Sequence, residues 1–322
     1  MSLPPGWAPH APEHHPGIIP LRALGIDDYF AGTLGAIKGH WRPLLAIAAA
    51  VACVVTISWL PAAIAGQDLV RSFLAFASLD PGSSDAQVTE AARQVGHEFL
   101  RFWPWLLWVG FTEWLALVVI DAGSALVVSR AVLGQRTSPD AALRQLLRLL
   151  PRLLLLTLVG GVLLVIGFAL CIVPGILLTL LWFAAPTAVA LEGASPVSAL
   201  RRSWHLVSKS FWRVLGILLL ISVCYSLGMQ VITTPIGILT SVGWVGSVTG
   251  GVTGGVTGGV TGAAPSDGAV NLIVLGYLAL GVAGIVTYPI VAVARVLAYL
   301  DLRIRHEDLA PALIEASGSQ PS

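Results

Sequence analysis

The chain has 322 residues, of which 56% are apolar and only 11% are charged. Soluble domains carry about 25% charged residues, so this composition excludes a soluble globular enzyme. A chain this apolar, with a formal net charge of only +1, would collapse in water, which excludes a disordered protein. The near-neutral charge provides no basic face for phosphates, and we expect no nucleic-acid partner. The expected solvent and partner is the lipid bilayer.

Six segments approach the ~20 mostly apolar residues that a helix needs to cross the hydrocarbon core. The predicted fold class is all-α: a polytopic membrane protein with six transmembrane helices and additional amphipathic helices at the membrane surface. The expected spans are residues 43–65, 102–129, 153–172, 175–191, 214–233 and 270–297. Only Cys171-Ile-Val-Pro-Gly175 separates the third span from the fourth, which predicts a tight hairpin.

The six spans define a membrane domain over residues 41–305, between two cytoplasmic segments. Residues 1–40 are expected to form a flexible tail, containing Pro and His, and an entry helix, and residues 306–322 a C-terminal tail. The repeated Val-Thr-Gly-Gly unit predicts an outer linker over 246–268, because glycine pairs have a high backbone entropy cost in a helix. Residues 88–99 have apolar side chains at helical spacing, which predicts an amphipathic helix on the outer surface.

Two inner connections resemble each other: Ser138-Pro-Asp-Ala-Ala-Leu-Arg144 and Ser195-Pro-Val-Ser-Ala-Leu-Arg201. In each, Ser is the expected helix cap and Pro occupies the first helical position, which predicts two basic interfacial helices. Lys38-Gly-His-Trp-Arg42 at the first span also echoes Lys209-Ser-Phe-Trp-Arg213 at the fifth. Two interpretations remain open. The chain repeats three times a unit that consists of a surface helix, an arginine and two spans, or the similarities arose by convergence on the residue pattern of membrane proteins.

The distribution of Lys and Arg predicts the orientation. Fifteen of these residues flank the spans on one side, against Arg71, Arg93 and Arg101 on the other. Because the side richer in Lys and Arg faces the cytoplasm, both termini are predicted to be cytoplasmic. The abundance of Arg, Ala and Gly is typical of a GC-rich bacterial genome, so the expected location is a bacterial plasma (inner) membrane.

No catalytic constellation is recognisable in the sequence. It has no His-Glu-x-x-His motif for a metal and no Gly-x-Ser-x-Gly nucleophile elbow. We therefore expect no enzymatic activity, and no catalytic, cofactor-binding or metal-binding residues.

Two carboxylates in the second span, Glu113 and Asp121, form the first candidate site. Eight residues separate them, which places them about 80° apart on one broad helical face. Charges at this depth are costly, so we expect both groups to face the bundle, protonated or paired, with Arg295 as a partner for Asp121. The site is either a structural clamp between helices or a proton or cation relay.

A charge cluster on the inner face is the second candidate site. Its members are Glu192, Arg201, Arg202, Lys209, Arg213, Asp301, Arg303 and Arg305. Basic groups near a membrane surface attract anionic lipid headgroups by about 1 kcal/mol each. The cluster either binds such headgroups or sets the topology and pairs internally.

Several motifs together point to a known family. They are Pro174-Gly-Ile, Glu192-Gly-x-Ser-Pro, Ala199-Leu-Arg-Arg-Ser203, Phe211-Trp-Arg-Val-Leu-Gly216 and Tyr299-Leu-Asp-Leu-Arg-Ile-Arg305, with Pro16-Gly-Ile-Ile-Pro-Leu-Arg22 at the start. These stretches resemble the bacterial multi-pass family called the glycerophosphoryl diester phosphodiesterase membrane domain, or YciC-like family. The family name comes from members fused to a phosphodiesterase domain, so the resemblance implies membrane anchoring rather than chemistry. This chain is expected to differ from such fusions, because it has no soluble region long enough for a catalytic barrel of ~250 residues.

The sequence thus favours a non-enzymatic structural or interaction module of the membrane. The alternative is a transporter or a lipid or small-molecule carrier that uses the intramembrane carboxylates. A third interpretation, based on the family name alone, is the membrane part of a glycerophosphodiester phosphodiesterase system.

Overall fold

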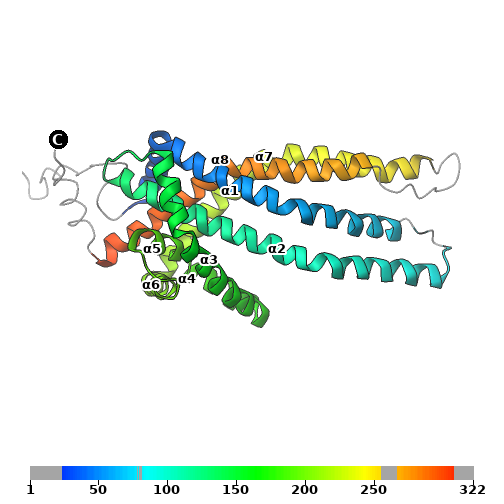
Figure 1. Cartoon of the computed structure of the whole chain (residues 1–322), viewed down its shortest axis with the longest axis horizontal. Helices are drawn as coiled ribbons and strands as arrows, with labels where there is room; N and C mark the ends of the chain where they lie inside the picture. The colour runs from blue at the N-terminus through cyan, green and yellow to red at the C-terminus, as the bar shows by residue number, and fades with distance from the viewer. Residues whose placement is uncertain (1–23, 78, 80–81, 255–266, 308–322) are drawn as a thin grey trace, which may run out of the picture. The chain divides into compact units, whose positions relative to one another are not determined.

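The computed structural model describes residues 24–77, 79, 82–254 and 267–307. This part of the chain is helical and contains no strand. The helices in chain order (Figure 1) are α1 (Ile26–Ala77), α2 (Asp85–Val132), α3 (Pro139–Leu170), α4 (Ile172–Leu181), α5 (Ala185–Glu192), α6 (Pro196–Lys209), α7 (Phe211–Gly254) and α8 (Asp267–Glu307).

Six helical segments in the described residues are long and apolar enough to cross a membrane. They are Ile26–Ala77, Asp85–Val132, Pro139–Leu170, Ile172–Glu192, Phe211–Pro235 and Val282–Glu307. Each overlaps one of the six predicted spans, in the same order. The fold is therefore that of an all-α multi-pass membrane protein, which confirms the predicted fold class.

The helices form two compact units. The described residues of unit 1 lie within Met1–Ile47, Val118–Ser222 and Tyr288–Ser322, and those of unit 2 within Ala48–Leu117 and Val223–Thr287. Large side chains are fully buried in unit 1: Leu24, Ile47, Val127, Val128, Val132, Leu153, Val189, Leu206, Leu297, Tyr299 and Leu302. In unit 2 many large apolar side chains point outward, among them Val54, Ile57, Ile64 and Val231. Such a surface is stable where lipid replaces water.

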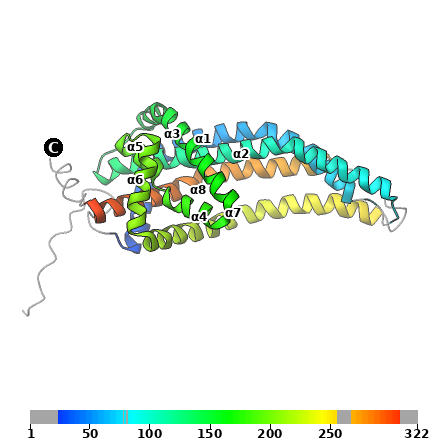
Figure 2. The ribbon, with the colours of Figure 1, turned by 90° about the horizontal axis from the view of Figure 1, so that it is seen from below.

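Within unit 1, α3, α4, α5 and α6 pack against one another (Figures 1 and 2). Cys171 is extended, with φ −172° and ψ 156°, and reverses the chain between α3 and α4. This turn is the predicted hairpin. The two helices approach closely at Gly167, where a Cβ atom would lie 2.8 Å from the Leu178 side chain. A Cβ atom at position 167 would therefore require the end of the Leu178 side chain to shift.

The two similar connections share their backbone geometry. Ser138 caps α3 and Ser195 caps α6, each through a hydrogen bond of 3.4 Å from the backbone N–H three residues later. Each cap follows a glycine with positive φ, 71° at Gly134 and 61° at Gly193, a conformation that glycine adopts without strain. The predicted capping is confirmed at both positions.

The predicted fourth span, 175–191, is two helices rather than one. Helix α4 ends at Leu181 and α5 begins at Ala185, after a turn over residues 182–184. Pro186 lies in the first turn of α5, where its missing N–H costs nothing. The Ser203 hydroxyl donates to the Leu181 carbonyl oxygen at 2.6 Å and accepts from the Ala184 N–H at 3.2 Å. These two bonds satisfy backbone groups that the break leaves without helical partners.

Two predicted surface helices are not separate elements. Residues 88–99 begin α2, and the segment after Ser138 begins α3, so each continues into the following span. Pro104 and Pro151 lie inside these helices without ending them. At the two Lys-x-x-Trp-Arg motifs the path does bend, because His40 (φ −131°, ψ 30°) kinks α1 and Ser210 (φ −134°, ψ 36°) separates α6 from α7.

The prediction that the glycine-rich linker starts at residue 246 is also wrong. Helix α7 continues to Gly254, so it includes the first glycines of the Val-Thr-Gly-Gly repeat. Once a helix has formed, each added residue gains a hydrogen bond without a new nucleation cost, which offsets the ~1 kcal/mol penalty of a glycine. Residues 255–266 of the predicted linker, residues 1–23 of the N-terminal tail and residues 308–322 of the C-terminal tail lie outside the described residues.

Candidate functional site

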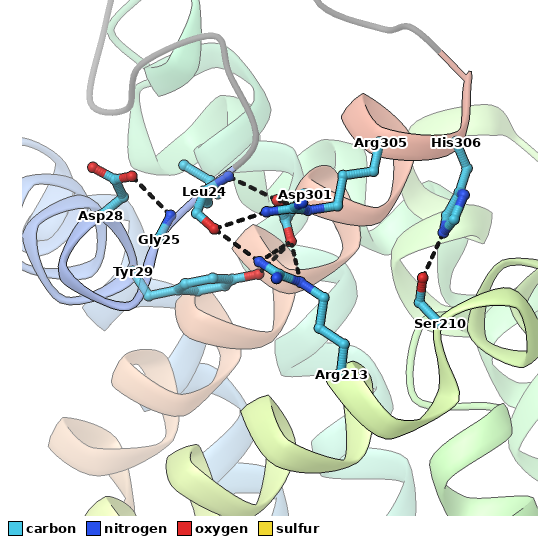
Figure 3. Close-up of polar contacts among 9 residues, drawn as sticks. All are labelled: Leu24, Gly25, Asp28, Tyr29, Ser210, Arg213, Asp301, Arg305 and His306. Atoms are coloured by element: carbon cyan, nitrogen blue, oxygen red, sulfur yellow. Dashed lines mark hydrogen bonds and ion pairs between the residues drawn. The ribbon is translucent and has the colours of Figure 1, made fainter.

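Asp301 of α8 is the centre of a polar network in unit 1 (Figure 3). Asp301 is fully buried, with 0% of its surface exposed. Its carboxylate accepts hydrogen bonds from the Tyr29 hydroxyl at 3.0 Å and from the Leu24 backbone N–H at 2.8 Å. Two guanidinium groups complete its surroundings, Arg213 at 3.3 Å and Arg305 at 2.9 Å. The buried charge is therefore compensated by opposite charges and by neutral donors, as a charge in a protein interior requires.

The same two arginines bind the start of α1. The Leu24 carbonyl oxygen accepts a hydrogen bond from Arg213 at 2.8 Å and one from Arg305 at 3.1 Å (Figure 3). The backbone N–H and the backbone C=O of Leu24 are thus both satisfied by side chains of α7 and α8. Ser210, between α6 and α7, also contacts His306 of α8, with 2.7 Å between the hydroxyl oxygen and Nε2. The network ties the entry of α1 to the ends of α7 and α8.

Glu192 and Glu307 organise a second cluster in unit 1. Arg202 of α6 contacts Glu192 and lies 2.8 Å from Glu307, while Arg303 of α8 lies 3.6 Å from Glu192 and 3.0 Å from Glu307. The Tyr299 hydroxyl donates to Glu192. Two carboxylates therefore face two guanidinium groups, and the cluster is neutral.

The charge of Arg202 is stabilised by this cluster. Burial lowers the pKa of the guanidinium, but hydrogen bonds with Glu192 and Tyr299 and the charges of Glu192 and Glu307 outweigh it. The net effect raises the pKa of Arg202 above its usual value. Arg202 therefore remains a cation and connects the end of α5 and the end of α8 to α6.

Asp121 and Arg295 form the intramembrane ion pair that the sequence predicted, with 2.9 Å between the two side chains. Both residues belong to unit 1, and Asp121 is only 5% exposed. Glu113 belongs to unit 2, where it is half-buried and forms no ion pair with a described residue. Tyr225 of α7 lies near Glu113 and near Thr287 of α8. The two carboxylates thus have different surroundings.

The predicted inner-face cluster is divided by the structure. Arg213, Asp301 and Arg305 form one network, and Glu192, Arg202 and Arg303 form the other. Arg201 and Lys209 join neither network. Both side chains are exposed on α6 and form no ion pair with another described residue.

The sequence did not identify several site residues: Leu24, Tyr29, Tyr299, Ser210, Glu307 and His306 in the networks, and Ser203 at the break between α4 and α5. Tyr29 and Tyr299 could have been suspected, because a buried tyrosine needs a partner for its hydroxyl. Leu24 gave no such signal, because its backbone rather than its side chain takes part.

In these networks, carboxylates, guanidinium groups and hydroxyls form ion pairs and hydrogen bonds with one another. No group of three or more potential metal ligands occurs among the described residues. Comparisons with known protein families, with curated proteins and with solved structures found no match.

Replacing Ser203 with Ala is expected to lower the free energy of unfolding by about 1–3 kcal/mol. Ser203 is fully buried, and its loss leaves the Leu181 carbonyl and the Ala184 N–H without partners. Thermal unfolding of the detergent-solubilised protein measures this change. The matched control is Ser208→Ala on the exposed side of α6, and an equal effect of the two substitutions would contradict the role of Ser203.

Proposed function

We propose that this chain is a non-enzymatic structural or interaction module of a bacterial plasma membrane. The observation that carries the proposal is the pairing of Asp121, Glu192 and Asp301, each of which contacts at least one arginine in unit 1. Carboxylates occupied in this way connect helices and are not free to act as general bases or to pass protons. Their contacts favour a bundle built for a fixed arrangement of helix ends.

The proposed orientation places both termini in the cytoplasm. Its support is the excess of Lys and Arg on one side of the spans, which includes Arg202, Arg213, Arg303 and Arg305 of the two networks. In this orientation the paired arginines lie at the cytoplasmic ends of the spans.

A transporter or carrier is the second candidate, and Glu113 is the observation in its favour. This carboxylate lies within a predicted span, half-buried and outside the ion pairs of the described residues. Intramembrane carboxylates of this kind mark proton and ion pathways in other proteins. The family resemblance supports a third candidate, the membrane part of a glycerophosphodiester phosphodiesterase system.

A flux experiment separates the first two candidates. Purified protein in sealed vesicles is expected to leave the proton and K⁺ permeability equal to that of empty vesicles. The same result is expected for Glu113→Gln and for the control Glu90→Gln, which lies on the exposed start of α2. A proton flux that disappears in Glu113→Gln and persists in Glu90→Gln would overturn the module proposal in favour of a transporter.

The enzymatic candidate has its own measurement. Purified protein incubated with glycerophosphocholine is expected to release no glycerol phosphate. Hydrolysis that one point substitution abolishes would overturn the non-enzymatic proposal.

A further inference from the structure

Helix α6 carries a stripe of basic side chains on its outer face. Arg201, His205 and Lys209 are exposed and follow one another at four-residue intervals, so they line one side of the helix about 6 Å apart along its axis. The opposite side is buried in unit 1 through Ala199, Leu200, Ser203, Leu206 and Val207. We call Arg201, His205 and Lys209 the α6 stripe.

Helix α3 carries a second stripe at the same distance from its cap. Arg144, Arg148 and Arg152 are exposed and also occur at four-residue intervals. They lie six, ten and fourteen residues after Ser138, just as the α6 stripe lies six, ten and fourteen residues after Ser195. We call these three residues the α3 stripe. The two similar connections therefore repeat a surface as well as a cap.

The stripes differ from the buried networks in that no carboxylate of a described residue pairs with them. Among the described residues, none of the six side chains forms an ion pair, whereas Arg202, Arg213, Arg303 and Arg305 all do. Arg144 and Arg152 donate to backbone oxygens, those of Asp140 and Gly193. The arginines and Lys209 of the stripes therefore carry positive charge that no described carboxylate pairs with.

The position of the α3 stripe along its helix points to the membrane surface. On the same side of α3, the exposed residues after Arg152 are apolar: Leu155, Val162 and Ile166, each at least half exposed. From Leu153 to Leu170 the helix extends about 27 Å, close to the ~30 Å hydrocarbon core. Arg152 then lies at the edge of the core, and Arg144 lies about 12 Å farther out. The stripe spans the depth of the lipid headgroups.

We propose that the α3 and α6 stripes bind the phosphates of anionic phospholipid headgroups. The charge of the stripes is complementary to these lipids, and the lipid-facing surface of α3 continues directly into its stripe. Trp204, 48% exposed, lies beside the α6 stripe, as aromatic residues do at membrane interfaces. The proposal rests on the membrane location in the proposed function and adds a partner to it.

The test is lipid binding by the full-length protein in detergent micelles, measured by native mass spectrometry. Phosphatidylglycerol is titrated against the wild type and against Arg148→Gln/Arg201→Gln, which removes one charge from each stripe. At about fivefold per basic residue, the variant is expected to bind about thirtyfold more weakly. Phosphatidylcholine is expected to bind both proteins equally, and Arg148→Lys/Arg201→Lys is expected to keep the wild-type affinity.

The matched control is Arg93→Gln/Arg101→Gln, which removes two exposed charges from α2 and is expected to bind phosphatidylglycerol like the wild type. Equal losses in the two double variants would overturn the proposal, because binding would then depend on net charge alone. Displacement of the lipid by millimolar inorganic phosphate would also overturn it in favour of a soluble anion. Neither outcome changes the flux result, so failure of the lipid site is distinguishable from failure of the module.

Discussion

Asp301→Asn is expected to lower the free energy of unfolding by about 3 kcal/mol. The substitution keeps the size of the side chain but removes the buried charge that faces Arg213 and Arg305. Both arginines reach solvent in part, with side chains 39% and 28% exposed, so we expect the lower end of the range for a broken buried pair. Thermal and denaturant unfolding in detergent would measure the change.

Asp140→Asn is the control for this experiment, because Asp140 is exposed in the first turn of α3. It is expected to change stability by less than about 1 kcal/mol. If Asp301→Asn were as mild as Asp140→Asn, the carboxylate of Asp301 would not organise the ends of α1, α7 and α8.

Arg295→Leu is expected to cost about 3–5 kcal/mol, because it leaves the Asp121 carboxylate buried without its counter-ion. Asp121→Leu is expected to cost less, since the Arg295 side chain is less buried than the Asp121 side chain, 24% against 7% exposed. The double variant Asp121→Leu/Arg295→Leu is expected to recover most of the lost stability, because no charge then remains in the apolar surroundings.

The wild type, the two single variants and the double variant form a double-mutant cycle, which isolates the interaction between Asp121 and Arg295. Unfolding free energies that add within about 0.5 kcal/mol would show that the two side chains contribute independently, contrary to the ion pair. The same cycle with the exposed pair Arg93 and Glu90 is expected to give a coupling below about 1 kcal/mol.

Long apolar runs made the six spans predictable, because crossing lipid places a strict requirement on composition and length. The caps at Ser138 and Ser195 were predictable for a similar reason, since a cap depends on residues adjacent in the chain. The pairing of Asp121 with Arg295 followed from the cost of an uncompensated charge within a span.

Local signals failed where distant residues decide the outcome. The break between α4 and α5 is stabilised by Ser203, about twenty residues away, and no pattern within 175–191 indicates it. The continuity of α2 and α3 through Pro104 and Pro151 was also missed, because a single lost hydrogen bond does not end a long helix.

Apolar length, helix caps and the excess of arginine on one side are properties of neighbouring residues, and the amino-acid sequence by itself determined them. Only the tertiary structure decided which arginines are neutralised and which remain free. Arg201 and Arg202 are adjacent in the chain, yet Arg202 contacts Glu192 and Glu307 while Arg201 is exposed. Successive residues of a helix point about 100° apart, so the direction in which α6 packs determines the environment of each charge.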